Sequence, residues 1–264
     1  MKRYAVAILS LTLAAGASRA QVETKTVTYK AGDATLKGFM AYDPKVSATR
    51  PGVIVFPEWW GLNDYAKKRA VMLAELGYIA FAADLYGDGK VIDIKHPEDA
   101  KGMATFLRSN QAVWRARAEA AYKVLATDVH VDNKNIAAIG YCLGGSTALQ
   151  LAYTGADLKA VTTFHAGLPT PTAAEVGAVK AKILVCHGAA DPAVPMKAVE
   201  DLKAAMAAGK KPLDVVSYKG VVHSFTSPDA DKVGNPAMKY DKEADEDSWR
   251  RMRDLFRQEL GRGR

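Results

Sequence analysis

Residues 136–145 place a cysteine in a glycine-rich turn between an apolar segment and a helix expected to begin near Ser146. The turn reads Gly-Tyr-Cys-Leu-Gly, with Gly140 and Gly144 two residues on either side of Cys142. A nucleophile in a sharp strand-to-helix turn needs small residues there, because neighbouring backbone segments approach closely. The amino end of the helix also favours a thiolate or an oxyanion. The pattern predicts that Cys142 is a nucleophile; the alternative is a buried apolar cysteine.

A cysteine nucleophile needs a base, and the base needs a carboxylate to orient it. Asp191 lies in a loop after the apolar run Ile183–Val185, and His223 lies in a loop after Leu213–Tyr218. Taken singly, Asp191 could be a turn residue and His223 a surface residue. Because the carboxyl ends of parallel strands meet at one edge of a sheet, the order nucleophile, acid, histidine predicts a catalytic triad.

The elements that must position these residues alternate between short apolar runs and segments with apolar residues three or four apart. This alternation predicts an α/β fold, with a mostly parallel sheet and helices on both faces. Two alternating segments around Gly32 and Asp33 predict an antiparallel hairpin before it. The expected strands are Glu23–Ala31, Thr35–Tyr42, Val53–Phe56, Tyr78–Ala83, Ile136–Ile139, Ala160–Phe164, Ile183–Val185 and Leu213–Tyr218.

Three helical patterns are clearest. One runs from Tyr65 to Leu76, a second from Pro97 to Ala126 with a break near Asn110, and a third from about Pro236 to Leu260. In the third, four apolar residues share one face, namely Trp249, Met252, Phe256 and Leu260. The chain has no internal repeat and no linker, so a single domain is expected over residues 21–264.

The composition excludes several classes of protein. The chain has 264 residues, of which 49% are apolar and 25% charged, as expected for a globular protein with a full core. Two cysteines cannot form a dense disulfide framework, and no zinc-ligand spacing or nucleotide-binding motif is present. We therefore expect no metal and no cofactor. The net charge of +7 is too diffuse to indicate a nucleic-acid partner.

Residues 1–20 have the pattern of an export signal. Lys2 and Arg3 precede an apolar run, and Ser18-Arg19-Ala20 provides small residues at a cleavage site. The run is shorter than the roughly 20 residues that span a bilayer, so a retained membrane anchor is the weaker alternative. We expect cleavage before Gln21 and a mature protein exported to the periplasm or secreted, without a stable membrane anchor.

Taken together, the motifs resemble those of the dienelactone hydrolases, a branch of the α/β-hydrolases with a cysteine nucleophile. The resemblance rests on residues 140–145, His187-Gly188 with Asp191, Gly220 with residues 223–225, residues 83–86, and Glu58 with Gly61-Leu62. It implies an α/β-hydrolase fold, with Cys142 as nucleophile, His223 as base and Asp191 as the residue that orients it. The expected activity is hydrolysis of a small ester or lactone through an acyl-enzyme.

The resemblance also assigns supporting roles. In that family a glutamate after the third strand contacts the resting thiol, and Glu58 matches it, although it could be a surface residue. The oxyanion hole would be the backbone N–H groups of Leu143 and Trp59. Aromatic residues at these strand ends are candidates for the pocket wall or for the core, namely Trp59, Trp60, Tyr86 and Phe225.

One departure from the family concerns the substrate. The arginines that bind the dienelactone carboxylate are replaced here at about Asp88 and Ser227, which cannot form a bidentate pair with a carboxylate. The long helical region offers three candidate substitutes, namely Arg108, Arg115 and Arg117. A general carboxylesterase of different substrate range is therefore an alternative.

Two further alternatives remain. One is a binding protein without turnover, and the other is a redox protein that pairs Cys142 with Cys186. A strand between the two cysteines would separate them by roughly 10 Å, too far for a disulfide. Cys186 is then a buried apolar residue, and His165 and His187 are expected to be structural. The sequence does not predict an oligomeric state.

Overall fold

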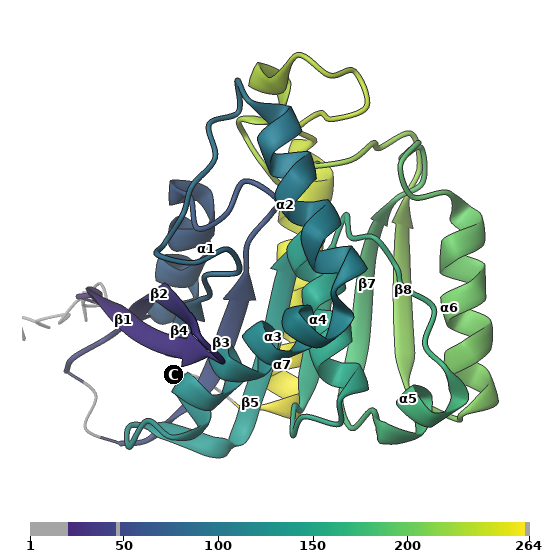
Figure 1. Ribbon diagram of the computed structural model, residues 1–264. Coiled ribbons are helices and arrows are strands. Elements are labelled where there is room, and N and C mark those ends of the chain that lie inside the picture. Colours follow the sequence, from purple (N-terminus) through teal and green to yellow (C-terminus); the bar gives the residue numbers. More distant parts are fainter. Residues whose placement is uncertain (1–20, 46–47, 262–264) are drawn as a thin grey trace, which may run out of the picture.

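The computed structural model describes residues 21–45 and 48–261, and its centre is an eight-stranded sheet (Figure 1). The order across the sheet is β1-β2-β4-β3-β5-β6-β7-β8. The β1–β2 and β2–β4 pairs are antiparallel and the other neighbouring pairs are parallel. The strands are β1 (Glu23–Ala31), β2 (Ala34–Tyr42), β3 (Arg50–Phe56), β4 (Ile79–Ala82), β5 (Val131–Tyr141), β6 (Ala160–Phe164), β7 (Lys182–Gly188) and β8 (Leu213–Tyr218). The predicted mostly parallel sheet with an N-terminal hairpin is confirmed, whereas the predicted export signal lies outside the described residues.

The helices alternate with the parallel strands. They are α1 (Asp64–Glu75), α2 (Pro97–Ser109), α3 (Gln111–Ala126), α4 (Leu143–Tyr153), α5 (Ala173–Ala178), α6 (Met196–Ala208) and α7 (Lys242–Glu259), with a short 3-10 turn, η1 (Ala230–Val233). The expected break at Asn110 separates α2 from α3. Among the described residues, none of these helices is long and apolar enough to cross a membrane.

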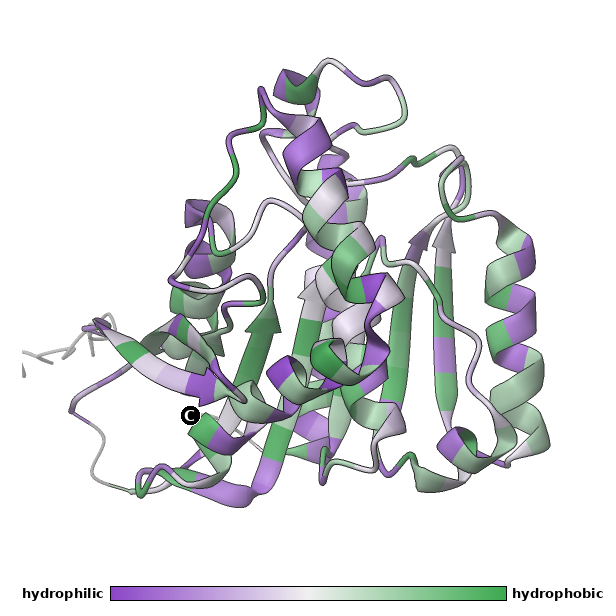
Figure 2. Ribbon diagram, viewed as in Figure 1, coloured by the Kyte–Doolittle hydropathy of each residue, from purple (hydrophilic) through white to green (hydrophobic). Residues whose placement is uncertain are grey.

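Both faces of the sheet are covered, which explains the continuous apolar runs in its strands. Successive side chains of a strand point to opposite faces. Ile54 and Phe56 of β3 pack on the side of α2 to α6, whereas Val53 and Val55 pack on the side of α1 and α7. Figure 1 shows α3 and α4 in front of the sheet and α7 behind it. In Figure 2 the hydrophobic residues are concentrated along the central strands.

Two helices begin at residues other than those expected. α4 begins at Leu143 rather than near Ser146, because Cys142 itself is the N-cap residue. α7 begins at Lys242 rather than near Pro236, and the Asp241 side chain accepts a hydrogen bond from the Ala244 amide at its start. Residues 237–239 instead pair with the backbone of His223. The tertiary pairing therefore overrides local helical propensity in this segment.

Candidate active site

The turn between β5 and α4 holds Cys142 in a strained conformation. Cys142 has φ 52°, a region that non-glycine residues rarely adopt. A Cβ added to Gly140 would lie 2.0 Å from the Gly144 carbonyl oxygen, and one added to Gly144 would lie 2.1 Å from the Phe56 carbonyl oxygen. Both positions therefore require glycine. The turn leaves the Cys142 side chain half-buried at the carboxyl edge of the sheet.

The loops after β7 and β8 bring an acid and a histidine together at the same edge. Nδ1 of His223 lies 2.6 Å from Oδ2 of Asp191, and both residues are buried. The other carboxylate oxygen of Asp191 accepts the Ala193 amide at 2.8 Å, which fixes the carboxylate in its loop. The Cys142 sulfur lies near enough to His223 to raise the pKa of its ring. The three residues selected from the sequence thus lie together, with His223 between Cys142 and Asp191.

The charge state of His223 follows from its two neighbours, Cys142 and Asp191. Burial lowers its pKa, but the Cys142 sulfur and the Asp191 carboxylate outweigh burial and raise the pKa well above its ordinary value. An imidazolium between a sulfur and a carboxylate is stabilised by both partners. The geometry accordingly favours the protonated ring of His223 between Cys142 and Asp191.

Glu58, the carboxylate after β3, is buried and faces the loop that carries His223. Its Oε1 accepts a hydrogen bond from Ser224 Oγ at 3.3 Å. Burial raises the pKa of Glu58 to about 7, against the smaller lowering effects of His223, Ser224 and Arg69. Because Glu58 is 3% exposed, it is not a surface residue, and it can gain or lose a proton near neutral pH.

Two backbone amides beside Cys142 have no acceptor. In the described part of the chain, neither Leu143 N–H nor Trp59 N–H donates a hydrogen bond. The first amide of a helix has no partner within the helix, so Leu143 N–H is free to bind an anion. The Tyr86 hydroxyl donates to the Trp59 carbonyl oxygen at 2.8 Å and so restrains the Trp59 backbone. Tyr86 therefore supports Trp59.

A cavity of about 210 Å³ borders Glu58. The residues that line it are Glu58, Trp60, Asn63, Asp64, Tyr65, Ile94, Ser224, Ser227, Asp229, Ala230, Val233 and Met238. Trp60 lines the cavity, whereas Cys142, Asp191 and His223 are not among its lining residues. The expectation that Phe225 lines it is wrong, because Phe225 is fully buried between His165 and Tyr218. No lysine, arginine or histidine of the described chain is among the lining residues.

The model of the dienelactone hydrolase family matches residues 36–260. The chain belongs to the dienelactone hydrolase family. As a member of this family it is a hydrolase of the ester- and lactone-cleaving class, and its fold is the α/β-hydrolase fold. The family and enzyme class expected from the sequence are confirmed.

Solved and curated relatives agree with this assignment. A dienelactone hydrolase-like promiscuous phosphotriesterase, P91 from metagenomic libraries, is 40% identical with a TM-score of 0.87, covering 91% of this chain and 99% of its own. The structure titled m3DLH is 39% identical with the same TM-score, covering 90% and 99%. A relative from Saccharolobus solfataricus, named as a carboxymethylenebutenolidase by inference, is 29% identical over 88% of this chain and 98% of its own length.

Asp88 and Ser227 stand where the resemblance to the dienelactone hydrolases places arginines. Ser227 lines the cavity. Asp88 does not, because it is exposed and pairs with Lys37 at 3.2 Å. Two of the candidate substitutes are engaged elsewhere: Arg115 pairs with Glu175, and Arg117 donates to the Leu85 carbonyl oxygen. Arg108 is exposed and does not line the cavity.

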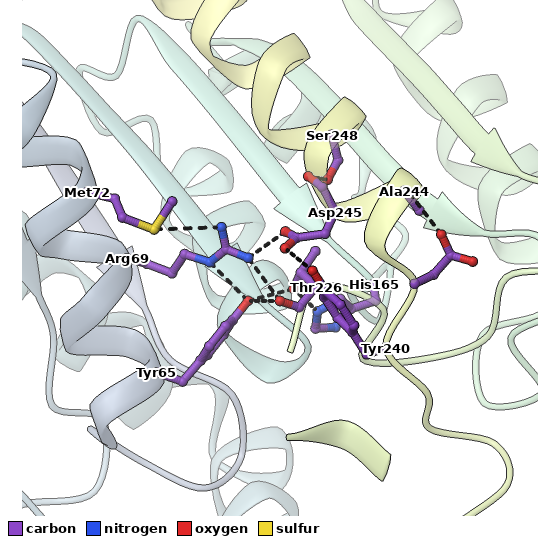
Figure 3. Close-up of polar contacts among 10 residues, drawn as sticks. Tyr65, Arg69, Met72, His165, Thr226, Tyr240, Ala244, Asp245 and Ser248 are labelled. Atoms are coloured by element: carbon purple, nitrogen blue, oxygen red, sulfur yellow. Dashed lines mark hydrogen bonds and ion pairs between the residues drawn. The ribbon is translucent and has the colours of Figure 1, made fainter. Parts of the chain in front are cut away.

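The residues behind His223 were not predicted from the sequence. The edge of the His165 ring faces the His223 ring at 5.2 Å, and His165 Nε2 lies 2.8 Å from Thr226 Oγ1. Arg69 and Asp245 form a buried ion pair beside Thr226 (Figure 3). One available signal was Arg69 itself, a charged residue on the apolar face of α1.

Cys186 and His187 lie in the interior. β6 separates β5 from β7, as expected, and the thiols of Cys142 and Cys186 are both free. His187 is buried, and burial lowers its pKa. In residues 21–45 and 48–261, no group of three His, Cys, Asp or Glu side chains could hold a metal ion.

Proposed function

We propose that the protein hydrolyses a small neutral ester or lactone by a thiol mechanism, with Cys142 as nucleophile, His223 as acid and base, and Asp191 as the group that orients His223. One observation carries the proposal. His223 lies 2.6 Å from Asp191 and close enough to Cys142 for the sulfur to raise the pKa of its ring, at the carboxyl edge of the sheet. This arrangement places the residues in the order nucleophile, base, orienting acid that acyl transfer requires.

The first half of the reaction forms a thioester. The Cys142 thiolate attacks the carbonyl carbon, and the free amides of Leu143 and Trp59 hold the developing oxyanion. When the tetrahedral intermediate collapses, the bond to the leaving oxygen breaks and the imidazolium of His223 gives that oxygen a proton. Asp191 keeps the Nε2 side of the ring directed at the reacting atoms.

The second half releases the acid. His223, now neutral, takes a proton from water as the water attacks the thioester carbon. The carbon–sulfur bond then breaks and the thiolate is restored beside the imidazolium. Glu58 is proposed to compensate the changes in charge of the Cys142–His223 pair. It can hold or release a proton near pH 7, and it lies next to Ser224.

We propose that substrate approaches Cys142 past the cavity beside Glu58 and Ser224, which the triad residues themselves do not line, so the charge of this cavity bears on the substrate. Its lining includes three carboxylates and no cation among the described residues. An anionic substrate would enter without a counter-charge, so a neutral ester or lactone fits better than dienelactone. A neutral phosphotriester is a second candidate, favoured by the 40% identity with a relative titled as a promiscuous phosphotriesterase.

The test is hydrolysis of p-nitrophenyl acetate by wild type, Cys142→Ala and Cys186→Ala, with folding checked by circular dichroism. We expect turnover in wild type and Cys186→Ala, background rate in Cys142→Ala, and an acyl adduct on Cys142 by mass spectrometry. Binding without turnover in wild type would favour a binding protein. Equal rates in wild type and Cys142→Ala would refute the thiol mechanism.

A substrate panel then tests the charge argument. It pairs a neutral lactone with its carboxylate-bearing analogue and includes paraoxon as a neutral phosphotriester. We expect a higher kcat/KM for the neutral lactone, and a preference for the anionic analogue would contradict the proposed class.

We also propose that the protein is exported, on the pattern of residues 1–20. N-terminal sequencing of protein recovered from the periplasm or medium should begin at Gln21. An intact Met1 on all of the cellular protein would contradict export.

A further inference from the structure

Helix α1 carries a buried arginine on the face that it packs into the molecule. Arg69 is 5% exposed, whereas its neighbour Lys68 is exposed. The Arg69 guanidinium donates to the Thr226 carbonyl oxygen at 2.9 Å and pairs with Asp245 at 2.5 Å (Figure 3). It also lies against three aromatic rings, those of Tyr65, Tyr141 and Trp249. A single cation thus joins α1, α7 and the loop after β8.

Thr226 is the point where this loop is held. It lies three residues after His223 and two after Ser224, the hydrogen-bond partner of Glu58. Its carbonyl oxygen also accepts from the Tyr65 hydroxyl at 3.1 Å, and its own hydroxyl lies 2.6 Å from that of Tyr65. The position of the catalytic loop therefore depends on contacts with α1.

A chain of polar contacts runs from Arg69 toward the ring of His165. A guanidinium only donates, and Nε of Arg69 donates to the Tyr65 hydroxyl at 3.2 Å. The Tyr65 hydroxyl in turn donates to the Thr226 carbonyl oxygen. The Thr226 hydroxyl lies 2.6 Å from the Tyr65 hydroxyl and 2.8 Å from His165 Nε2. Thr226 thus links Arg69 and Tyr65 to the ring that lies behind His223.

A charged His223 is compatible with a neutral His165 ring beside it, but not with a charged His165 ring. Burial lowers the pKa of His165 well below its ordinary value, and the nearby His223 lowers it further. Two imidazolium rings 5.2 Å apart would repel each other. Burial and the charge of His223 thus keep the His165 ring neutral while His223 carries its proton.

Stability alone is a weak reason for such an arrangement. A buried ion pair gains little over apolar residues of similar volume, because both charges must be removed from water. We propose that Arg69 is a positioning residue: by holding Thr226, it fixes the loop that carries His223 and Ser224, and thereby the contact of Ser224 with Glu58. This inference rests on the proposed function of Cys142 and His223.

Arg69 also acts on Glu58 through its charge. Burial raises the pKa of Glu58, and Arg69 is one of three groups that lower it; the others are His223 and Ser224. The hydroxyls of Tyr65 and Tyr141 also interact with Glu58, and the carboxylates of Asp64 and Asp229 line the same cavity. Removal of the Arg69 charge should therefore raise the pKa of Glu58.

The experiment compares wild type with Arg69→Met, Arg69→Lys and the surface control Lys68→Met. For Arg69→Met we expect kcat to fall about 10- to 100-fold with KM within about twofold, because the catalytic groups are displaced rather than the substrate pocket. Arg69→Lys keeps the charge but loses the planar fork, so it should lower kcat as well. Lys68→Met should behave as wild type.

A second readout needs no ester. The pH dependence of Cys142 alkylation by iodoacetamide should contain a step near pH 7 that is absent in Glu58→Gln. This step should move to higher pH in Arg69→Met and stay in place in Arg69→Lys. If no ester is hydrolysed by wild type, the proposed function fails while this profile still tests Arg69.

Several results would overturn the inference. One such result is a folded Arg69→Met variant with the kcat of wild type. Another is a pH step in Cys142 alkylation that lies at the same pH in wild type and in Arg69→Met. If Arg69→Met does not fold, Arg69→Lys decides: a wild-type kcat in that variant shows that the fork does not position the loop.

Discussion

The carboxyl-terminal ends of β5 and β7 each carry a cysteine, and their surroundings differ. Cys142 stands in the turn beyond β5, half-buried and close to His223. Cys186 lies within β7 at 1% exposure, where burial raises its pKa to about 12 despite the lowering effect of the nearby Tyr218 hydroxyl. The same side chain is thus a candidate nucleophile in one place and an apolar filler in the other, because the backbone decides its exposure and partners.

The two strand ends also continue differently. β5 turns at once into α4, which sets Cys142 at a helix N-terminus. β7 continues into a loop, and a Cβ on Gly188 would lie 2.6 Å from the Val221 carbonyl oxygen. This close approach lets the loops after β7 and β8 meet, so β7 contributes Asp191 to the site instead of its cysteine.

The largest expected difference between the two cysteines is in the reactivity of their thiols. At pH 7 we expect iodoacetamide to alkylate Cys142 at least about 1,000-fold faster than Cys186, because a buried thiol with a pKa of about 12 is almost never a thiolate. Peptide mass mapping over time measures both rates in one sample, and a urea-unfolded sample provides the control. Comparable rates in the folded protein would contradict the contrast.

The second prediction concerns Asp191, which the loop after β7 contributes to the site. Asp191→Asn should lower kcat by about 100- to 10,000-fold, because the amide cannot stabilise the imidazolium of His223. Cys186→Ala, on the same strand, should keep kcat within about twofold. Steady-state kinetics on p-nitrophenyl acetate compare the two, and a small effect of Asp191→Asn would show that His223 needs no orienting acid.

The close packing of the β5 turn should appear in stability. Gly144→Ala should destabilise the fold by about 2–4 kcal/mol, since its Cβ would overlap the Phe56 carbonyl group. Gly177→Ala is the matched control, because nothing lies within 4 Å of a Cβ there. Urea unfolding measures both variants, and equal midpoints would contradict a sterically required glycine.

The smallest effect concerns Glu58, which faces the site from the end of β3. In the unfolded chain its pKa is near 4.5, and burial raises it to about 7 in the folded protein. Between these values the folded state holds a proton that the unfolded state lacks, so this residue makes stability fall as pH rises through that window.

Glu58→Gln removes this dependence. Its stability relative to wild type should increase between pH 5 and pH 8 by on the order of 1–3 kcal/mol. Urea unfolding at the two pH values tests this, with the exposed Glu200→Gln as control. A difference that does not change with pH would show that Glu58 is not protonated in the folded protein.

Much of the fold was predictable because its signals are local. The bounds of β1, β6 and β8 match those expected, and the glycine spacing around Cys142 and the order Cys142, Asp191, His223 were all legible in short segments. Apolar runs of five or six residues require burial on both faces, which in turn requires a parallel sheet with helices on each side.

Other features are set by contacts between distant segments. The start of α7 depends on the pairing of residues 237–239 with His223, which removes them from the helix. The burial of Phe225 likewise depends on where its loop packs against β6 and β8. No local pattern encodes either outcome.

The amino-acid sequence by itself thus determined the strand set, the turn that carries Cys142 and the chain order of the proposed triad. Only the tertiary structure decided what surrounds them: the contact of Ser224 with Glu58, 166 residues apart, and that of Arg69 with Thr226, 157 residues apart. Hydrophobic periodicity fixes which face of an element is buried. Which polar groups then meet in the interior depends on how α1 and α7 pack on the same face of the sheet.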